Sequence, residues 1–325
     1  MRRSLRLATQ YVLVVVAAFV LNFGLPRLAP GDPADYLAPP DSAGVLTEDE
    51  RRDILSRYEL DGSTGEQFGA YVRNLGRGDL GVSIRTGEPV RDVVLDRLGW
   101  TLLLVGTAVV LATAIGVTLG FAGGWRRGSK RDIGLLTTVL AVDALPAFFV
   151  GLMLLLVFSV ELDWFPVYGA ISPGELGSWA ALRDAATRLV LPVATLTLAG
   201  AGSTFLVARS AMVTELQEDY VFMARAKGLT ERAVRRHARR NALLPVSTAA
   251  LLGFSTLISA ATVVESIFSY PGLGSLAFDS VVARDYPVLQ AVFVLLALIA
   301  IAANLLNDLL YPVFDPRVRA AGSAA

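Results

Sequence analysis

Cysteine, histidine and lysine, three residue types that often carry enzyme chemistry, are nearly missing from this chain. The 325-residue sequence has no cysteine and one histidine, His237, which excludes thiol catalysis, cysteine-bound zinc and any multi-histidine metal site. Neither lysine belongs to a Gly-Lys-Ser/Thr phosphate loop, because Lys130 precedes Arg131 and Lys227 precedes Gly228. No Gly-x-Ser-x-Gly nucleophile elbow is present. The sequence predicts no catalytic residue and no metal site, and it favours transport over catalysis.

Two acidic residues stand out because they lie in or beside apolar runs. Asp143 lies about ten residues into such a run, three residues before Pro146, and an ionisable group at that depth usually faces a polar cavity. We therefore expect Asp143 to line a pathway and to favour cationic solutes. The alternatives are that Asp143 pairs with a basic residue across the bundle or stays protonated. Glu265, at the end of another run, is a second pathway candidate.

The runs themselves predict membrane spans. The chain is 54% hydrophobic and only 18% charged, with a mean hydropathy of +0.55, whereas soluble domains carry about 25% charge. A helix needs about 20 apolar residues to cross a bilayer, and the sequence offers six such runs: 1–29, 98–125, 133–160, 189–208, 242–264 and 288–310. The first run could be a cleavable signal peptide, but no small-x-small cleavage site follows it. We expect an all-α, polytopic membrane protein with six spans.

The loops between these runs alternate in charge, which predicts their orientation. The N-terminal tail, the 124–132 loop and the 209–240 segment are basic, whereas the 161–187 and 265–287 loops are acidic. Because basic loops stay in the cytoplasm, both termini are expected there. The segment 30–97 then forms a small external subdomain, and residues 313–325 form a cytoplasmic tail.

The 218–245 segment, expected on the cytoplasmic side, has the most informative pattern. It predicts two short amphipathic helices broken at Gly228 and Leu229, with Thr230 as the N-cap of the second. A solvated basic loop that obeys the positive-inside rule is the simpler alternative. That alternative does not account for Ala-Arg-Ala-Lys-Gly at 224–228 followed by Asn-Ala-Leu-Leu-Pro at 241–245.

This pattern resembles the coupling loop of type I ABC importer permeases, in the dipeptide/oligopeptide permease B-like branch that handles peptides and nickel. Further stretches resemble the same family in the same order: Pro-Gly-Asp-Pro at 30–33, Arg-Gly-Asp-Leu-Gly at 77–81, Trp-Phe-Pro at 164–166, Tyr-Pro-Gly-Leu-Gly at 270–274 and Asp-Pro-Arg-Val-Arg at 315–319. The resemblance covers nearly the whole chain.

The resemblance implies a six-transmembrane-helix permease: an N-terminal helix at 1–29 and a permease core over 98–312 that holds the other five spans. Within that core, a coupling loop at 212–243 is expected to dock on a separate ATPase. The docking residues it implies are Ala224, Arg225, Ala226, Lys227 and Gly228. ATP and magnesium would be bound by that ATPase and no cofactor by this chain. The implied partners are ABC ATPase subunits, a second homologous permease, an extracellular or periplasmic solute-binding protein and membrane lipid, in a prokaryotic cell membrane; no nucleic acid is expected.

The implied function is to form half of the pathway for a peptide or a related small solute, such as a nickel chelate or glutathione. The alternative is a secondary transporter that works as a single chain. That class uses several intramembrane charges and internal inverted repeats, whereas this sequence has one clear intramembrane charge and no obvious repeat.

Overall fold

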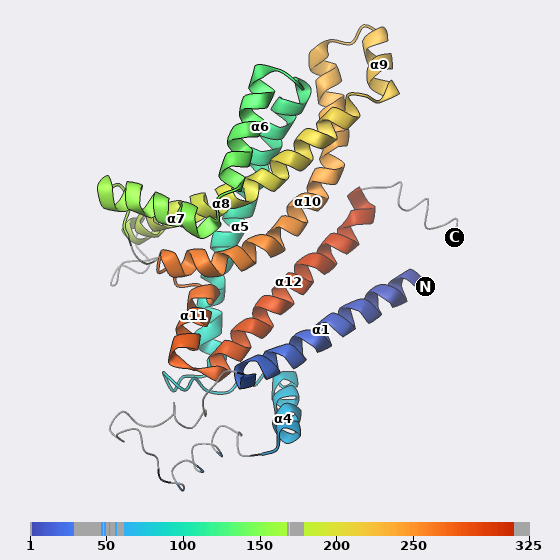
Figure 1. Ribbon diagram of the computed structural model, residues 1–325. Helices are drawn as coiled ribbons and strands as arrows, with labels where there is room; N and C mark the ends of the chain where they lie inside the picture. Colours follow the sequence, from blue (N-terminus) through green and yellow to red (C-terminus); the bar gives the residue numbers. More distant parts are fainter. Residues whose placement is uncertain are drawn as a thin grey trace. The chain divides into compact units, whose positions relative to one another are not determined.

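Helices dominate the described part of the chain (Figure 1). The computed structural model describes residues 2–28, 47, 49, 52, 56, 62–167, 169 and 179–314. The helices are α1 (Arg2–Leu28), α4 (Thr64–Gly76), α5 (Val90–Trp125), α6 (Lys130–Asp143), α7 (Ala147–Leu155), the π-helical η1 (Leu156–Glu161), α8 (Trp179–Glu215), α9 (Asp219–Ala226), α10 (Glu231–Ile267), α11 (Leu273–Ala283) and α12 (Tyr286–Phe314). Apart from one isolated β-bridge between Val82 and Pro89, the described residues contain no extended pairing, and the predicted all-α fold is confirmed.

Several of these helices can cross a membrane, as the polytopic prediction requires. By length and hydropathy they are α5, α8, α10 and the Tyr286–Leu305 part of α12. The pair formed by α6 and α7–η1 passes the same test as one broken span. The predicted first span corresponds to α1, whose described apolar part, Thr9–Gly24, is a shorter helix.

The predicted span 133–160 is not one straight helix. Its two halves, Lys130–Asp143 and Ala147–Glu161, meet at an angle of 92°, and α6 and α7 diverge sharply in Figure 1. Pro146 explains the break, because its ring removes a backbone N–H and disfavours the helical conformation at the preceding residue, Leu145.

The chain forms two compact units. One comprises residues 1–99 with 273–301, and the other comprises residues 100–272 with 302–325. The first unit has a core where the beginning of α5 packs against α11 and α12; its buried members include Val90, Leu273, Ala277 and Val292. Close van der Waals packing of these apolar side chains stabilises this contact.

Polar contacts complete the first unit. Asp285 is buried at the start of α12, where its carboxylate accepts a hydrogen bond from the Ser83 hydroxyl at 2.5 Å and from the Arg85 N–H at 3.2 Å. Asn22 of α1 donates to the Tyr71 hydroxyl of α4 at 2.9 Å. Helix α4 begins with a capping box between Ser63 and Glu66, and the hydrogen bonds from Ser63 hold the pKa of Glu66 below its usual range.

In the second unit, glycines let α5 lie directly against α8. A Cβ on Gly116 would lie 2.7 Å from the Thr204 Cβ, and a Cβ on Gly120 would lie 2.6 Å from the Phe205 carbonyl oxygen. Gly124 meets α8 one turn later, where a Cβ would lie 2.8 Å from the Arg209 carbonyl oxygen. Such small-residue spacing is how membrane helices approach closely, so these positions set the separation between α5 and α8.

Candidate functional site

The predicted coupling loop, 212–243, consists of the end of α8, all of α9 and the start of α10. Helix α9 ends where Gly228 adopts a φ of +75°, a conformation that glycine adopts without a steric penalty. There the Gly228 N–H donates to the Arg225 carbonyl at 2.9 Å, and the Leu229 N–H donates to the Ala224 carbonyl at 3.1 Å. The predicted break at Gly228 is therefore present.

The chain resumes its helix at the predicted N-cap. The Thr230 hydroxyl accepts a hydrogen bond from the Ala233 N–H at 3.4 Å, which satisfies one donor of the first turn. The prediction of a second short helix was wrong, however. The helix that Thr230 caps is α10, which runs without a break from Glu231 to Ile267.

Helix α9 is anchored on one side and open on the other. Val221 is its one buried residue. Beside it, the Tyr220 hydroxyl donates to Glu215 at the end of α8 at 2.6 Å and also interacts with Asn241 of α10. Burial, reinforced by the bond to Glu215, raises the pKa of Tyr220 to about 12, so the hydroxyl stays a hydrogen-bond donor at neutral pH. These contacts fix α9 to the two long helices that flank it.

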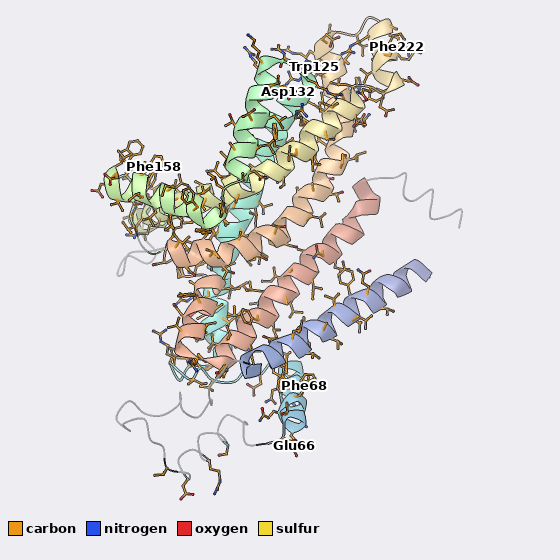
Figure 2. The ribbon with its side chains drawn as sticks, in the orientation of Figure 1. Glu66, Phe68, Trp125, Asp132, Phe158 and Phe222 are labelled. Carbon is orange, nitrogen blue, oxygen red and sulfur yellow. The ribbon has the colours of Figure 1, made fainter. Side chains whose placement is uncertain are left out.

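Two large apolar side chains occupy the open side of α9. Phe222 is 73% exposed and Met223 is 53% exposed, and Phe222 lies at the end of the second unit where α9 projects (Figure 2). Exposed aromatic and methionine side chains beside charged ones are typical of protein interaction surfaces. Sequence reasoning missed both residues, although two adjacent large apolar residues in a basic segment were a usable signal.

The five predicted docking residues follow directly after this apolar pair. Ala224 is half-buried, whereas Arg225, Ala226, Lys227 and Gly228 are exposed. The guanidinium of Arg225 is already engaged, because its Nε lies 2.9 Å from the Glu231 carboxylate and its Nη2 lies 3.3 Å away. This exposed ion pair adds little stability, but it orients Arg225 across the turn that joins α9 to α10.

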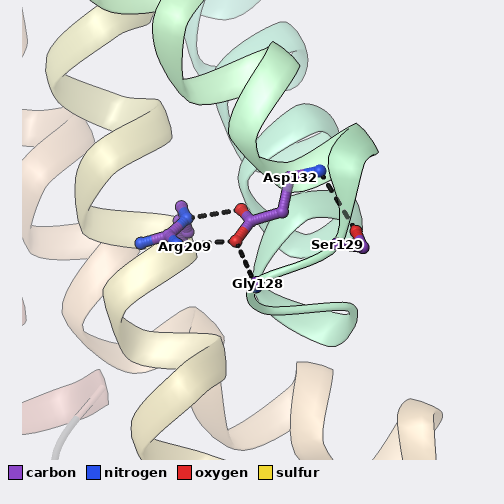
Figure 3. A network of polar contacts seen from close by, with 4 residues as sticks. All are labelled: Gly128, Ser129, Asp132 and Arg209. Atoms are coloured by element: carbon purple, nitrogen blue, oxygen red, sulfur yellow. Dashed lines mark hydrogen bonds and ion pairs between the residues drawn. The ribbon is translucent and has the colours of Figure 1, made fainter.

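A second network ties α8 to the first turn of α6 and to the loop before it (Figure 3). The Asp132 carboxylate accepts two bonds of 2.7 Å from the guanidinium of Arg209 on α8 and one of 2.9 Å from the Gly128 N–H. The Ser129 hydroxyl in turn accepts a bond from the Asp132 N–H at 3.2 Å. Asp132 is 1% exposed. Loss of its pairing with Arg209 would leave a buried charge without a counter-ion, which strongly destabilises a protein. Sequence reasoning did not find this pair.

The first turns of α10 also contact α5. The guanidinium of Arg235 lies 5.8 Å from the centre of the Trp125 ring, and that of Arg239 lies 5.8 Å from the Phe121 ring, distances at which cation–π attraction operates. Trp125, Asp132 and Phe222 lie at the same end of the second unit in Figure 2. This end therefore joins α5, α6, α8, α9 and α10 through polar and aromatic contacts.

The two pathway candidates lie on different helices and in different surroundings. Glu265 on α10 is 0% exposed, accepts a bond from the Thr101 hydroxyl at 2.7 Å and lies against Gly272. Its backbone carbonyl accepts from the Tyr270 N–H at 2.8 Å, so Glu265 shapes the turn after α10. Asp143 is exposed at the end of α6, with its carboxylate against Gly202 of α8. The structure does not bring Asp143 and Glu265 together as one site, and their roles in a pathway stay predictions.

Comparison with known proteins identifies the family. Residues 99–320 match the family of binding-protein-dependent transport system inner membrane components. This chain belongs to that family. The permease aligns with named relatives over nearly the whole length of both proteins.

Three of these relatives are permease proteins of peptide or glutathione transport systems. The oligopeptide transport system permease protein AppB of Bacillus subtilis is 36% identical over 94% of this chain and 95% of its own length. The di/tripeptide transport system permease protein DppB of Pseudomonas aeruginosa is 37% identical over 92% of this chain and 93% of its own. The glutathione transport system permease protein GsiC of Escherichia coli is 38% identical, with the same 92% and 93% coverage. The permease is thus a multi-pass transport subunit of an ABC importer.

Proposed function

We propose that this permease forms half of the translocation pathway of an ATP-driven importer for short peptides. The named relatives act on oligopeptides, di- and tripeptides or glutathione, and all of these solutes are amino acids joined through amide bonds. That shared chemistry makes short peptides the best-supported solute class. In this proposal, ATP and magnesium are bound by a separate ATPase, and a solute-binding protein and a second permease complete the importer.

Helix α9 is the proposed docking element for the ATPase. The observation that carries this proposal is the pair Phe222 and Met223, which stands exposed on a short helix whose opposite side is anchored by Val221 and Tyr220. A rigid helix with an apolar face is suited to insert into a groove on another protein. Ala224, Arg225, Ala226, Lys227 and Gly228 would then line the edge of the contact.

The proposed orientation places α9 in the cytoplasm. The loop 126–131 and the segment 209–240 concentrate basic residues, and both belong to the end of the second unit that carries Trp125 and Phe222 (Figure 2). The positive-inside rule places such an end on the cytoplasmic side, where ATP is available. Both termini would then lie in the cytoplasm as well.

The proposal is tested by replacing Phe222 and Met223 together with alanine in the assembled importer. We expect at least tenfold weaker retention of the ATPase subunit on the purified permease, and a matching loss of ATP-dependent uptake of dialanine into proteoliposomes, because interface aromatic residues often contribute 2 kcal/mol or more. Phe278→Ala is the matched control, since Phe278 is 58% exposed but lies on α11. Equal ATPase retention by the double variant and the control would contradict the docking assignment.

A further inference from the structure

The break between α6 and α7 exposes backbone acceptors at an unusual place. The N–H of Ala144 donates to the Leu140 carbonyl at 3.0 Å, and that of Leu145 donates to the Val142 carbonyl at 3.1 Å. Pro146 has no N–H to continue the ladder. Helix α7 starts anew at Ala147, and its first N–H groups do not reach back to α6. Within the described residues, the carbonyls of Asp143, Ala144 and Leu145 therefore accept no hydrogen bond, and all three residues are exposed.

The side chain of Asp143 adds a carboxylate at the same residue as the first of these acceptors. Among the described residues it has no hydrogen-bond or ion-pair partner, and two arginines of α8 pair with other acids. Arg209 pairs with Asp132 at 2.7 Å, and Arg188 pairs with Asp184 at 2.9 Å. The predicted alternative of a basic partner for Asp143 therefore finds no support within this part of the chain.

Asp143 also lies far from the charged start of α6. It ends a helix that begins at Lys130, so at about 1.5 Å per residue it stands about 20 Å along the α6 axis from that charged end. A charged group at such a depth avoids lipid and faces a polar cavity or a partner. The carbonyl end of the α6 dipole adds further negative potential at the same point.

Space for the carboxylate is provided by α8. A Cβ on Gly202 would collide with the Asp143 carboxylate, so only glycine leaves the carboxylate in this position. The break thus presents a carboxylate and three backbone carbonyl groups that all favour a positively charged hydrogen-bond donor.

We propose that this break binds the α-ammonium group of a peptide as the solute passes through the permease. An ammonium group has three N–H donors and no acceptor, which fits a carboxylate that is close in sequence to backbone carbonyls without hydrogen bonds. Broken membrane helices bind cations in the same physical way, through unwound carbonyls and helix C-terminal ends. A divalent metal fits less well, because the described residues contain no group of three potential metal-ligating side chains. The inference rests on the proposed peptide import and names the part of the solute that this site recognises.

The test compares two probes in the reconstituted importer: dialanine, which carries the ammonium group, and N-acetyl-dialanine, which does not. We expect Asp143→Asn to lower ATP-dependent uptake of dialanine about tenfold, the lower end of the range for a charge-assisted hydrogen bond, and to leave N-acetyl-dialanine uptake unchanged. Asp143→Glu should retain most dialanine uptake because it keeps the carboxylate. Gly202→Ala should lower dialanine uptake in the same selective way, because it displaces the carboxylate.

Glu161→Gln is the matched control, since Glu161 is an exposed acid at the far end of the same helix pair. An equal effect of Asp143→Asn on both probes, or no effect on either, would overturn the inference. If neither protein carries the acetylated probe, the inference requires that Asp143→Glu retain the dialanine uptake that Asp143→Asn loses. Uptake that depends on sodium or potassium at Asp143, rather than on the amine, would also overturn it. Failure of the unmodified importer to take up dialanine with ATP would instead contradict the proposed peptide import itself, and this inference with it.

Discussion

At the scale of single residues, the ion pair of Asp132 with Arg209 is a contact that the sequence alone does not reveal. It receives both arms of the Arg209 guanidinium and the Gly128 N–H while almost fully buried. The two partners are separated by 77 positions, and each alone looks like another charge at the edge of an apolar run. By contrast, the break at Gly228 and the N-cap at Thr230 were predictable, because both depend on the local chemistry of adjacent residues.

Replacing Asp132 with asparagine should destabilise the permease by about 3 kcal/mol, because the change leaves the Arg209 charge without its counter-ion in a confined site. The measurement is thermal unfolding of the purified protein in detergent. Asp184→Asn is the matched control, since its pair with Arg188 is an i, i+4 pair on one helix and should contribute less than about 1 kcal/mol. An equally small effect at Asp132 would show that the two hydrogen bonds from Arg209 to Asp132 are not needed for stability.

At the scale of helices, the apolar runs predicted where spans lie but not how far each helix extends. The predicted span 98–125 belongs to a helix that begins at Val90, and the predicted span 242–264 belongs to one that begins at Glu231. Charged turns continue these helices beyond the apolar windows, and hydropathy alone does not detect such turns. The 92° bend at Pro146 was equally hidden, since proline in a membrane helix is compatible with several geometries.

The glycines of α5 lead to a prediction about how closely α5 and α8 pack. Gly120→Ala should lower the stability of the permease by about 1–3 kcal/mol, because its Cβ would meet the rigid backbone of α8 and overpack the contact. Gly106→Ala is the control on the same helix, since no atom lies within 4 Å of a Cβ there. The check is the midpoint of thermal unfolding of each variant. A loss at Gly106 as large as at Gly120 would argue that helix contact is not the cause.

At the scale of the whole molecule, transport requires that the ATPase contact and the pathway be connected. In the second unit, α9 is fixed to the end of α8 through Tyr220 and Glu215, and α8 is fixed to the start of α6 through Arg209 and Asp132. Helix α6 ends at Asp143. In our account, movement of α9 on its ATPase would thus reach the proposed ammonium site through two rigid helices, a route whose coupling has to be measured rather than read from proximity.

The central claim, that α9 docks on a separate ATPase, is tested most directly by site-specific cross-linking. The chain has no cysteine of its own, so Met223→Cys places a single thiol on the exposed side of α9, and Phe278→Cys provides an exposed control on α11. The account predicts that a short thiol cross-linker joins Met223→Cys, but not Phe278→Cys, to the ATPase subunit, with a yield that changes when ATP is added. No cross-link from Met223→Cys in an importer that still transports dialanine would contradict it.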